Sequence, residues 1–203
     1  MNTLVEEMQY SFYDSTEISK KQSEITNFLL NLTEERKTLY RSDEINEEEY
    51  PEICNNAVSR IGHIVLASHG DQIVGMSAGV KLDTNIILRM LPLWAGFIVV
   101  KSEYQGRGIG QKLTDFHTMF TKNMWCFWIE ITRIENKAML RILENDDEVV
   151  FVGKDDRFVY GFSPNRSELK IFNPFIHLLL RLFKVETPRI KKIYNFIAFL
   201  VNL

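Results

Sequence analysis

Hydrophobic residues recur with a helical period in the N-terminal part of the chain. From Ser19 to about Tyr40, apolar residues stand three or four positions apart with charged residues between them, which predicts an amphipathic helix. A second short helix is predicted from Pro51 to Arg60, after an acid-rich stretch (42–52) with the composition of a solvated loop. Residues 1–17 show no clear period.

Further along, the period becomes that of strands. Two β-rich runs within 63–82 surround His69-Gly70-Asp71, which predicts a hairpin. Residues 93–101 are almost wholly apolar, as in a strand covered on both faces. Later apolar patterns predict a helix, a strand, a short helix and a second hairpin; they lie at 108–122, 127–132, 137–145 and 148–162.

This order of elements predicts an α/β (α+β) fold, a mixed and mostly antiparallel sheet flanked by helices. We expect residues 1–165 to form one domain. Residues 166–203 are expected to form a helical extension, because Pro174 and Pro188 stand where helices begin. After Pro188, apolar residues follow a helical stripe: Ile190, Ile193, Tyr194, Ile197 and Leu200.

Charge modifies this picture at the two ends of the chain. The 203 residues carry a formal net charge of -3, without the basic footprint of a nucleic-acid-binding protein, so no nucleic-acid partner is expected. Residues 1–60 hold thirteen acidic against six basic residues, whereas 170–203 hold six basic residues and one acid. The apolar, basic stretch 170–203 could pack on the domain, join two subunits of a homodimer or contact an anionic membrane surface.

The two cysteines, Cys54 and Cys126, do not form a metal-binding pattern. They lie far apart, and neither belongs to a Cys-x-x-Cys or Cys/His spacing, so no metal site is expected. The N-terminus has no apolar segment of the kind found in secretory signals, and no apolar run reaches the roughly 20 residues of a membrane-spanning helix. We therefore expect a cytoplasmic protein, either free or at a membrane surface.

The histidines are expected to be structural. His117 would follow Leu113 by one turn on the predicted helix, where packing or a hydrogen bond is expected rather than catalysis. His63 and His69 flank the first hairpin and could reach an acceptor site, although an isolated histidine more often serves structure.

The stretch 97–113 combines a strand, a short turn and a glycine-rich entry into a helix. Gly106, Gly108 and Gly110 would let the backbone approach a ligand closely. The first N–H groups of a helix lack internal partners, and the helix dipole makes that end attractive to phosphate. Arg107 adds a cation. These features predict a diphosphate site at residues 105–110.

Two common phosphate-binding motifs do not fit this stretch. A P-loop has Lys-Ser or Lys-Thr directly after its second glycine, whereas Gln111 follows Gly110 here. The dinucleotide motif Gly-x-Gly-x-x-Gly has a different spacing, and it opens a domain, whereas helices and a hairpin come first here.

The residues from Val100 to Gly110 instead resemble the acyl-CoA motif of the GNAT superfamily of N-acyltransferases, Gln/Arg-x-x-Gly-x-Gly/Ala. Gln105, Gly108 and Gly110 occupy its three defining positions. The order of elements over about 19–162 is also similar. The resemblance implies acetyl-CoA, or another acyl-CoA, as co-substrate. It also implies acyl transfer to a primary amine by direct attack in a ternary complex, without a metal.

The resemblance also implies roles for individual residues. The backbone N–H groups of six residues would bind the CoA diphosphate: Gln105, Gly106, Arg107, Gly108, Ile109 and Gly110. The main chain of three residues would pair with the pantetheine arm like an added strand: Ile98, Val99 and Val100. Asn136 corresponds to the family's asparagine before the helix that follows the fifth strand, which helps to hold the cofactor.

The sequence departs from the family where the proton donor is expected. Leu143 stands at the position of a tyrosine that protonates the leaving thiolate in many members, and Ser102 replaces a common proline. Glu130 is the candidate general base, because burial in its apolar strand would raise its pKa. The alternative is a surface glutamate paired with Arg133 or Lys137.

Three functions are consistent with these patterns. The first is an N-acetyltransferase that uses acetyl-CoA and an amine acceptor. The second is a GNAT module that binds acyl-CoA with weak or no turnover, in line with the missing tyrosine. The third is a membrane-peripheral acyltransferase for a long-chain or lipid-linked substrate, in line with the apolar, basic residues 170–203.

Overall fold

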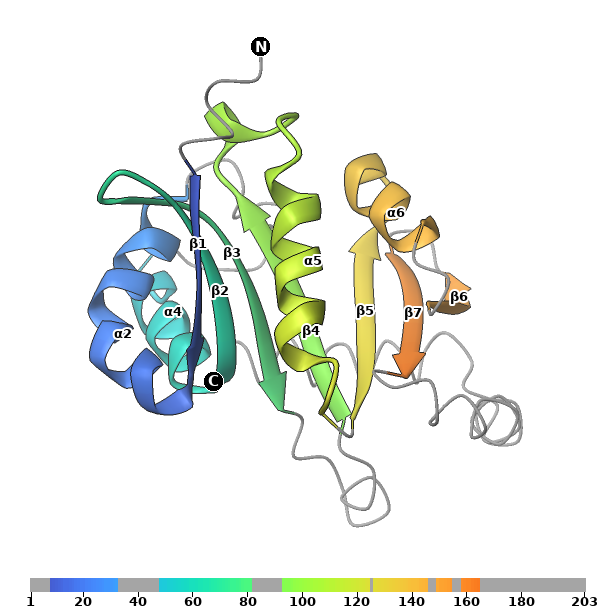
Figure 1. Cartoon of the computed structure of the whole chain (residues 1–203), viewed down its shortest axis with the longest axis horizontal. Helices are drawn as coiled ribbons and strands as arrows, with labels where there is room; N and C mark the ends of the chain where they lie inside the picture. The colour runs from blue at the N-terminus through green and yellow to red at the C-terminus, as the bar shows by residue number, and fades with distance from the viewer. Residues whose placement is uncertain are drawn as a thin grey trace. The chain divides into compact units, whose positions relative to one another are not determined.

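The computed structural model describes residues 8–32, 48–81, 93–124, 126–145, 149–154 and 158–164. The chain divides into two compact units, which are treated separately below. Figure 1 labels the helices and strands of the described residues. Among the described residues, the first unit holds those up to Val80 together with Phe97–Phe120. The second holds Lys81, residues 93–96 and the described residues from Thr121 onward.

The first unit is built on antiparallel strands in the order β1-β2-β3, followed by the end of β4. Its strands are β1 (Met8–Asp14), β2 (Ile61–His69), β3 (Gln72–Lys81) and the last residues of β4 (Leu93–Val100). Its helices are α2 (Ser15–Leu30), α4 (Tyr50–Ser59), the 3-10 turn η2 (Ser102–Tyr104) and α5 (Ile109–Thr121). The predicted first hairpin is confirmed, and Gly70 adopts a φ of 58° in its tight turn.

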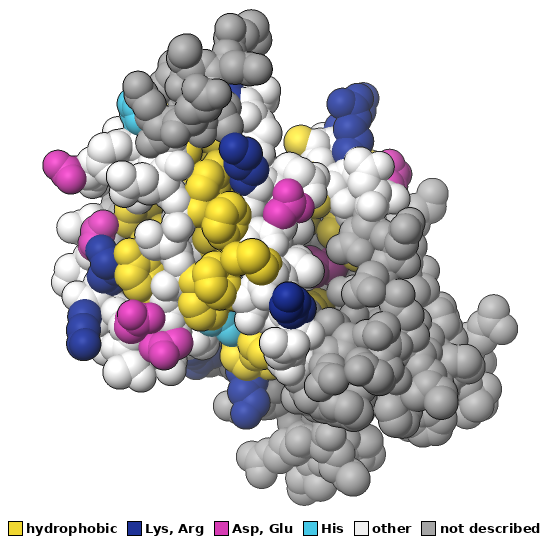
Figure 2. Space-filling view, in the orientation of Figure 1, with side chains coloured by type: hydrophobic (Ala, Val, Ile, Leu, Met, Phe, Trp, Pro, Cys, Tyr) yellow, Lys and Arg dark blue, Asp and Glu magenta, His cyan; other side chains and the backbone are white. Residues whose placement is uncertain are grey.

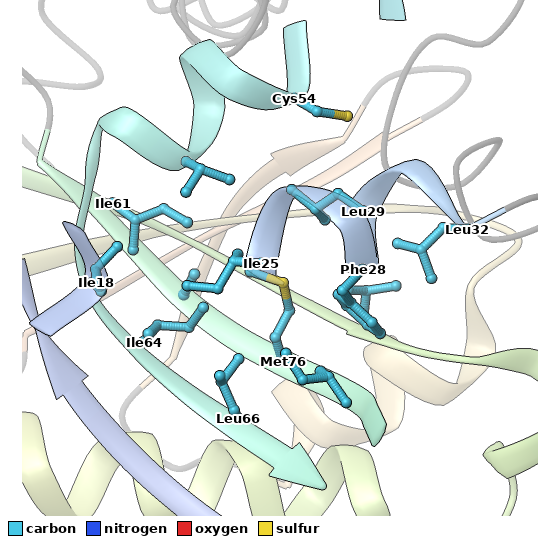
Figure 3. Packing of buried hydrophobic residues seen from close by; sticks show 14 of the residues in the cluster. Ile18, Ile25, Phe28, Leu29, Leu32, Cys54, Ile61, Ile64, Leu66 and Met76 are labelled. Atoms are coloured by element: carbon cyan, nitrogen blue, oxygen red, sulfur yellow. The ribbon is translucent and has the colours of Figure 1, made fainter. Parts of the chain in front are cut away.

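Alternate residues of β2 are buried on opposite faces of the sheet. Ile64 and Leu66 belong to the cluster that includes Ile25 of α2 and Met76 of β3 (Figure 3). Val65 on β2 instead belongs to the cluster under α5, with Ile109 and Leu113. Helices α2 and α4 therefore cover one face and α5 covers the other, which explains why most residues of β2 and nearly all of β3 are buried. The buried hydroxyl of Tyr50 donates to the carbonyl of Leu29 over 3.0 Å and ties α4 to α2.

The N-terminal elements differ from the prediction. Residues 8–14 form strand β1, although no period was recognised there. Helix α2 begins at Ser15, four residues before the predicted start, because Asp14 and Glu17 form a capping box. The Asp14 carboxylate accepts from the N–H groups of Thr16 (2.9 Å) and Glu17 (3.1 Å), and Glu17 accepts from the Asp14 N–H (3.2 Å). Helix α2 ends at Leu30, and residues 33–40 of the predicted helix lie outside the described residues.

The second unit confirms the later predicted elements. It contains the start of β4, β5 (Phe127–Arg133), α6 (Lys137–Glu144), β6 (Val150–Lys154) and β7 (Phe158–Pro164). The strand order is β4-β5-β7-β6, with β4 and β5 parallel and the other pairs antiparallel. Both units together give the mixed α/β architecture that the pattern predicts. The predicted extension, 166–203, lies outside the described residues; among those described, no helix is long and apolar enough to cross a membrane.

The capping box predicts a specific loss of stability. Asp14→Ala should lower the free energy of unfolding by about 1 kcal/mol, because two N-terminal amides of α2 lose their acceptor. Asp14→Asn should retain most of the stability, since asparagine caps helices equally well. Urea denaturation of both variants measures the difference. Equal losses in the two would mean that the charge of Asp14, and not its cap, stabilises this helix.

Candidate functional site

The link between β4 and α5 folds as a tight loop held at both ends. The Lys101 N–H donates to the carbonyl of Val74 on β3 over 2.9 Å, which fixes the end of β4. Gly106 and Gly108 adopt φ values of 72° and 79°, a left-handed conformation that strains any residue with a Cβ. Ile109 then enters the core beneath α5 with an exposed fraction of 1%. Gly106 and Gly108 are therefore required by the turn itself.

Side chains of the motif form hydrogen bonds within the loop. The Gln105 side-chain amide donates to the carbonyl of Val100 over 2.8 Å. The Arg107 guanidinium donates to the carbonyl of Glu103 over 2.9 Å and lies 5.4 Å from the centre of the Tyr104 ring. The Gln105 N–H donates to the carbonyl of Ser102 over 3.1 Å, so Gln105 acts on the loop shape through both of its donors.

The start of α5 presents backbone donors. The Lys112 N–H bonds to the carbonyl of Gly108 over 3.1 Å, and the N–H groups of the first helical residues before it have no carbonyl one turn back. Apart from the chain neighbours of each glycine, no atom of the described residues lies within 4 Å of where a Cβ on Gly106 or Gly108 would stand, so these residues leave this side of the loop open. Arg107 and Lys112 are exposed beside it. Such an arrangement can bind an anion.

Strand β4 pairs with β5 only near its start. The parallel pairs join Leu93–Ala95 to Phe127–Ile129. The three residues expected to face pantetheine, Ile98, Val99 and Val100, belong to the first unit and follow the last of these pairs along β4. The first unit therefore brings together the strand end, the glycine loop and the start of α5.

The remaining predicted residues belong to the second unit. Asn136 caps α6, where its side-chain oxygen accepts from the Met139 N–H over 3.1 Å. Leu143, at the position of the family's tyrosine, is buried on that helix with an exposed fraction of 4%. The glycine motif thus belongs to the first unit, whereas Glu130 and Asn136 belong to the second.

Glu130 lies on β5 and has a glycine beside it on each neighbouring strand. It pairs with Gly161 of β7, and its Oε2 lies 3.8 Å from where a Cβ on Gly96 of β4 would stand. A Cβ on Gly161 would approach the Glu130 Cβ to 3.3 Å. The half-buried carboxyl group therefore has room that larger neighbours would remove. The rings of Trp94 on β4 and Trp128 on β5 pack against each other, with their centres 6.1 Å apart.

Buried hydrogen bonds join α5 to β2 and β3. The Ser77 hydroxyl and His117 Nδ1 lie 2.5 Å apart, and His117 Nε2 lies 2.8 Å from His63 Nδ1. Burial lowers the pKa of His63 to about 4, and burial together with the neighbouring His63 lowers that of His117 to about 3. Both rings are neutral at pH 7 and tie α5 to β2 and β3. The expected hydrogen-bonding role of His117 is confirmed, but its partners, 40 and 54 residues away, leave no signal in the sequence.

Comparison with known proteins decides the family. Residues 60–148 match the model of the acetyltransferase (GNAT) domain. This part of the chain is a GNAT domain. The matched region includes the whole glycine motif and the stretch from β2 to α6, so the resemblance seen in the sequence is confirmed. No curated protein matches the chain.

Several solved structures share the GNAT fold. A putative acetyltransferase from Salmonella typhimurium, determined with its cofactor acetyl-CoA, has a TM-score of 0.53 and 13% identity, covering 78% of this chain and 94% of its own. A GNAT-family acetyltransferase from Streptococcus pneumoniae has a TM-score of 0.54 and 17% identity, covering 78% and 99%. A ribosomal-protein-S5-alanine acetyltransferase from Vibrio fischeri has a TM-score of 0.54 and 12% identity, covering 78% and 93%.

The buried histidines predict that the GNAT domain loses stability in mild acid. The folded pKa values, about 4 for His63 and about 3 for His117, lie below the ordinary 6.5, so the unfolded chain binds more protons between these values. The stabilising effect of the two neutral rings is complete above pH 6.5 and is lost as the pH falls toward 4. Each histidine contributes a slope of about 1.4 kcal/mol per pH unit.

Urea denaturation between pH 7 and pH 4 measures this slope. His117→Gln should reduce the slope by the contribution of one histidine, about 1.4 kcal/mol per pH unit. The variant should also lose some stability at pH 7. Comparing the variant with the wild type removes the contribution of the carboxylates, which is common to both. An unchanged slope in His117→Gln would contradict the assignment.

Proposed function

We propose that the protein is an N-acetyltransferase that moves an acetyl group from acetyl-CoA to a primary amine. The observation that carries the proposal is the glycine loop at the start of α5. Its left-handed residues, Gly106 and Gly108, turn an open backbone surface and the first amides of the helix outward. The acetyl-CoA bound to the Salmonella neighbour and the alanine acceptor named for the Vibrio neighbour support the same chemistry here.

The CoA diphosphate would bind the backbone N–H groups from Gly106 to Gly110. Of the six predicted amides, that of Gln105 already donates to Ser102, so Gln105 contributes by holding the loop against Val100. Arg107 and Lys112 add positive charge beside the amides. Because the loop is closed by its own side-chain bonds, little conformational entropy would be lost on binding.

The pantetheine arm would lie along the main chain of Ile98, Val99 and Val100. These residues follow the part of β4 that pairs with β5, so an extended ligand can add to β4 in the manner of a strand. The Asn136 side-chain oxygen is engaged as a helix cap, which leaves its NH2 group as the donor for the cofactor.

Acetyl-CoA supplies an activated thioester, and the chain supplies positioning and proton transfer. Holding the amine against the thioester in a ternary complex accounts for much of the expected rate. The attacking amine must lose a proton, and Glu130 is the residue we propose to accept it. The space left by Gly96 beside its carboxyl group supports this role.

A second function is favoured by one observation. Leu143 fills the position of the proton-donating tyrosine with a buried apolar side chain, so α6 offers no hydroxyl to the leaving thiolate at that position. Water or another group would then supply this proton, and turnover should be slow. A domain that binds acyl-CoA with little turnover is therefore the alternative.

Acetyl-CoA binding should depend on Gly108 and not on Gly70. Both residues have a positive φ and open space for a Cβ, so Gly108→Ala and Gly70→Ala should cost similar backbone strain, roughly 1–2 kcal/mol. Only Gly108→Ala alters the diphosphate loop, and it should weaken acetyl-CoA binding at least about tenfold, or 1.4 kcal/mol. Isothermal titration calorimetry measures all three proteins.

Two results would contradict the donor site. One is equal affinity in Gly108→Ala and the wild type. The other is a folded wild type that binds neither acetyl-CoA nor a long-chain acyl-CoA. Affinity lost equally in Gly70→Ala would point to general destabilisation of the domain.

Glu130→Gln separates the enzyme from the binding module. If Glu130 is the general base, the variant should lose about 10²- to 10⁴-fold in kcat while its affinity for acetyl-CoA is unchanged. The rate of free thiol release from acetyl-CoA, measured across a panel of primary amines, provides the assay. Turnover unaffected by Glu130→Gln would exclude this base, and acetyl-CoA binding with no turnover for any amine would favour the binding module.

A further inference from the structure

Strand β3 carries an irregularity directly beside the glycine loop. Gly75 pairs with Ala67 of β2. Ile73, two positions earlier, pairs with the very next residue of β2, Ser68. Val74 is therefore an extra residue on β3, which is the pattern of a β-bulge, where two residues of one strand oppose one residue of the other. Bulges are common next to active sites, because they bend a strand and redirect its groups.

The bulge holds the end of β4, the neighbouring strand. The carbonyl of Val74 accepts the hydrogen bond from the Lys101 N–H over 2.9 Å, where the chain leaves the sheet for the glycine loop. The preceding residue, Val100, accepts from the Gln105 side chain over 2.8 Å. The hydrogen bonds of the bulge and those of the loop therefore meet at Val100 and Lys101.

Gly75 lets β4 and α5 lie against bare backbone of β3. A Cβ on Gly75 would lie 3.1 Å from the Val99 carbonyl oxygen. It would also lie 3.2 Å from Cδ1 of Leu113 and 3.3 Å from Cγ2 of Val100, closer than the roughly 3.5–4.0 Å at which carbon atoms pack best. Gly75 does not adopt a left-handed φ, so these contacts, and not its own backbone conformation, require glycine here.

Helix α5 is also held by contacts away from Gly75. The hydrogen bond between Ser77 and His117 ties it to β3, and Tyr10 of β1 stacks on Phe116 with ring centres 5.0 Å apart. Figure 2 shows hydrophobic side chains gathered on this face of the molecule. Because these contacts fix the helix, a methyl group at Gly75 would displace mainly the end of β4.

We propose that Gly75 is a positioning residue for the acyl donor. Its bare backbone keeps the main chain of Val99 and Val100 close to β3 and in line with the glycine loop. The inference rests on the proposed function, in which this main chain pairs with pantetheine and the loop binds the diphosphate. A ligand that binds both parts at once requires them to be held within about 0.5 Å of the productive geometry. Gly75 touches no atom of the donor and acts only through β4.

Titration calorimetry of the full chain with acetyl-CoA tests the proposal in the Gly75→Ala variant. The added methyl group should shift the end of β4 and raise the dissociation constant about three- to tenfold. Ile25→Val is the control for stability, because it removes a methyl group from the cluster beneath α2 and should leave the affinity unchanged. Circular dichroism gives the folded fraction. In a variant that is nine-tenths folded, lost stability alone would change the dissociation constant by only about a tenth.

A double variant separates positioning from packing. Leu113→Val removes one carbon and Gly75→Ala adds one, so combining them should recover most of the stability lost in Gly75→Ala. The Val99 carbonyl oxygen would still face the new methyl group, so the double variant should bind acetyl-CoA more weakly than Leu113→Val alone. Affinity that recovers together with stability would mean that Gly75 serves only the packing of α5, and would overturn the proposal. If Gly75→Ala does not fold by itself, the same comparison provides the test.

The outcomes distinguish this proposal from the proposed function. If the wild type binds acetyl-CoA and a folded Gly75→Ala variant binds it equally well, the positioning role is wrong and the donor site remains. If the folded wild type binds no acyl-CoA, both the donor site and the positioning role are wrong. Weaker binding in Gly75→Ala and in the double variant, with unchanged binding in Ile25→Val, is the result that we expect.

Discussion

The burial of β2 and β3 on both faces is the constraint on which the rest of the first unit depends. Ile64 packs beneath α2 and Val65 beneath α5, so neither face can be solvated without exposing a core cluster. Because Ile109 and Leu113 anchor α5 to this sheet, the start of the helix is fixed, and the chain must turn sharply after Val100 to reach it. The glycine loop meets that requirement locally, and its open backbone is the diphosphate site that we propose.

The hydrogen bonds between α5 and the sheet follow from the same burial. Ser77, His117 and His63 place hydrogen-bonding groups inside an apolar layer, where unpaired groups would be costly. A neutral histidine has one N–H and one acceptor nitrogen, so His117 can donate on one side and accept on the other. These hydrogen bonds therefore fix the position of α5 along the sheet more specifically than apolar contacts alone would. The same histidines lower the stability of the fold in acid.

The glycine loop and the candidate catalytic residues depend on the fold in different ways. The loop from Gln105 to Gly110 is shaped by its own hydrogen bonds and helix start, and it follows the family motif closely. The catalytic side does not: Leu143 replaces a proton donor, and Glu130 is set between strands with glycine at Gly96 and Gly161. In the proposed function, donor binding therefore rests on a loop that follows the family motif, whereas the proposed acyl transfer rests on groups that differ from the family pattern.

From the sequence, one can predict the strands and helices from β2 to β7, the family and the glycine turn before α5, because glycine placement, helix starts and hydrophobic periods act over a few residues. Local signals were also present but missed at Asp14 and Glu17, whose capping box starts α2, and in β1, whose alternation is short. Tertiary structure alone decided the contacts of His117 with Ser77 and His63, and the stacking of Tyr10 on Phe116. These partners lie tens of residues apart, and only the pairing of strands and the packing of α5 on the sheet bring them together.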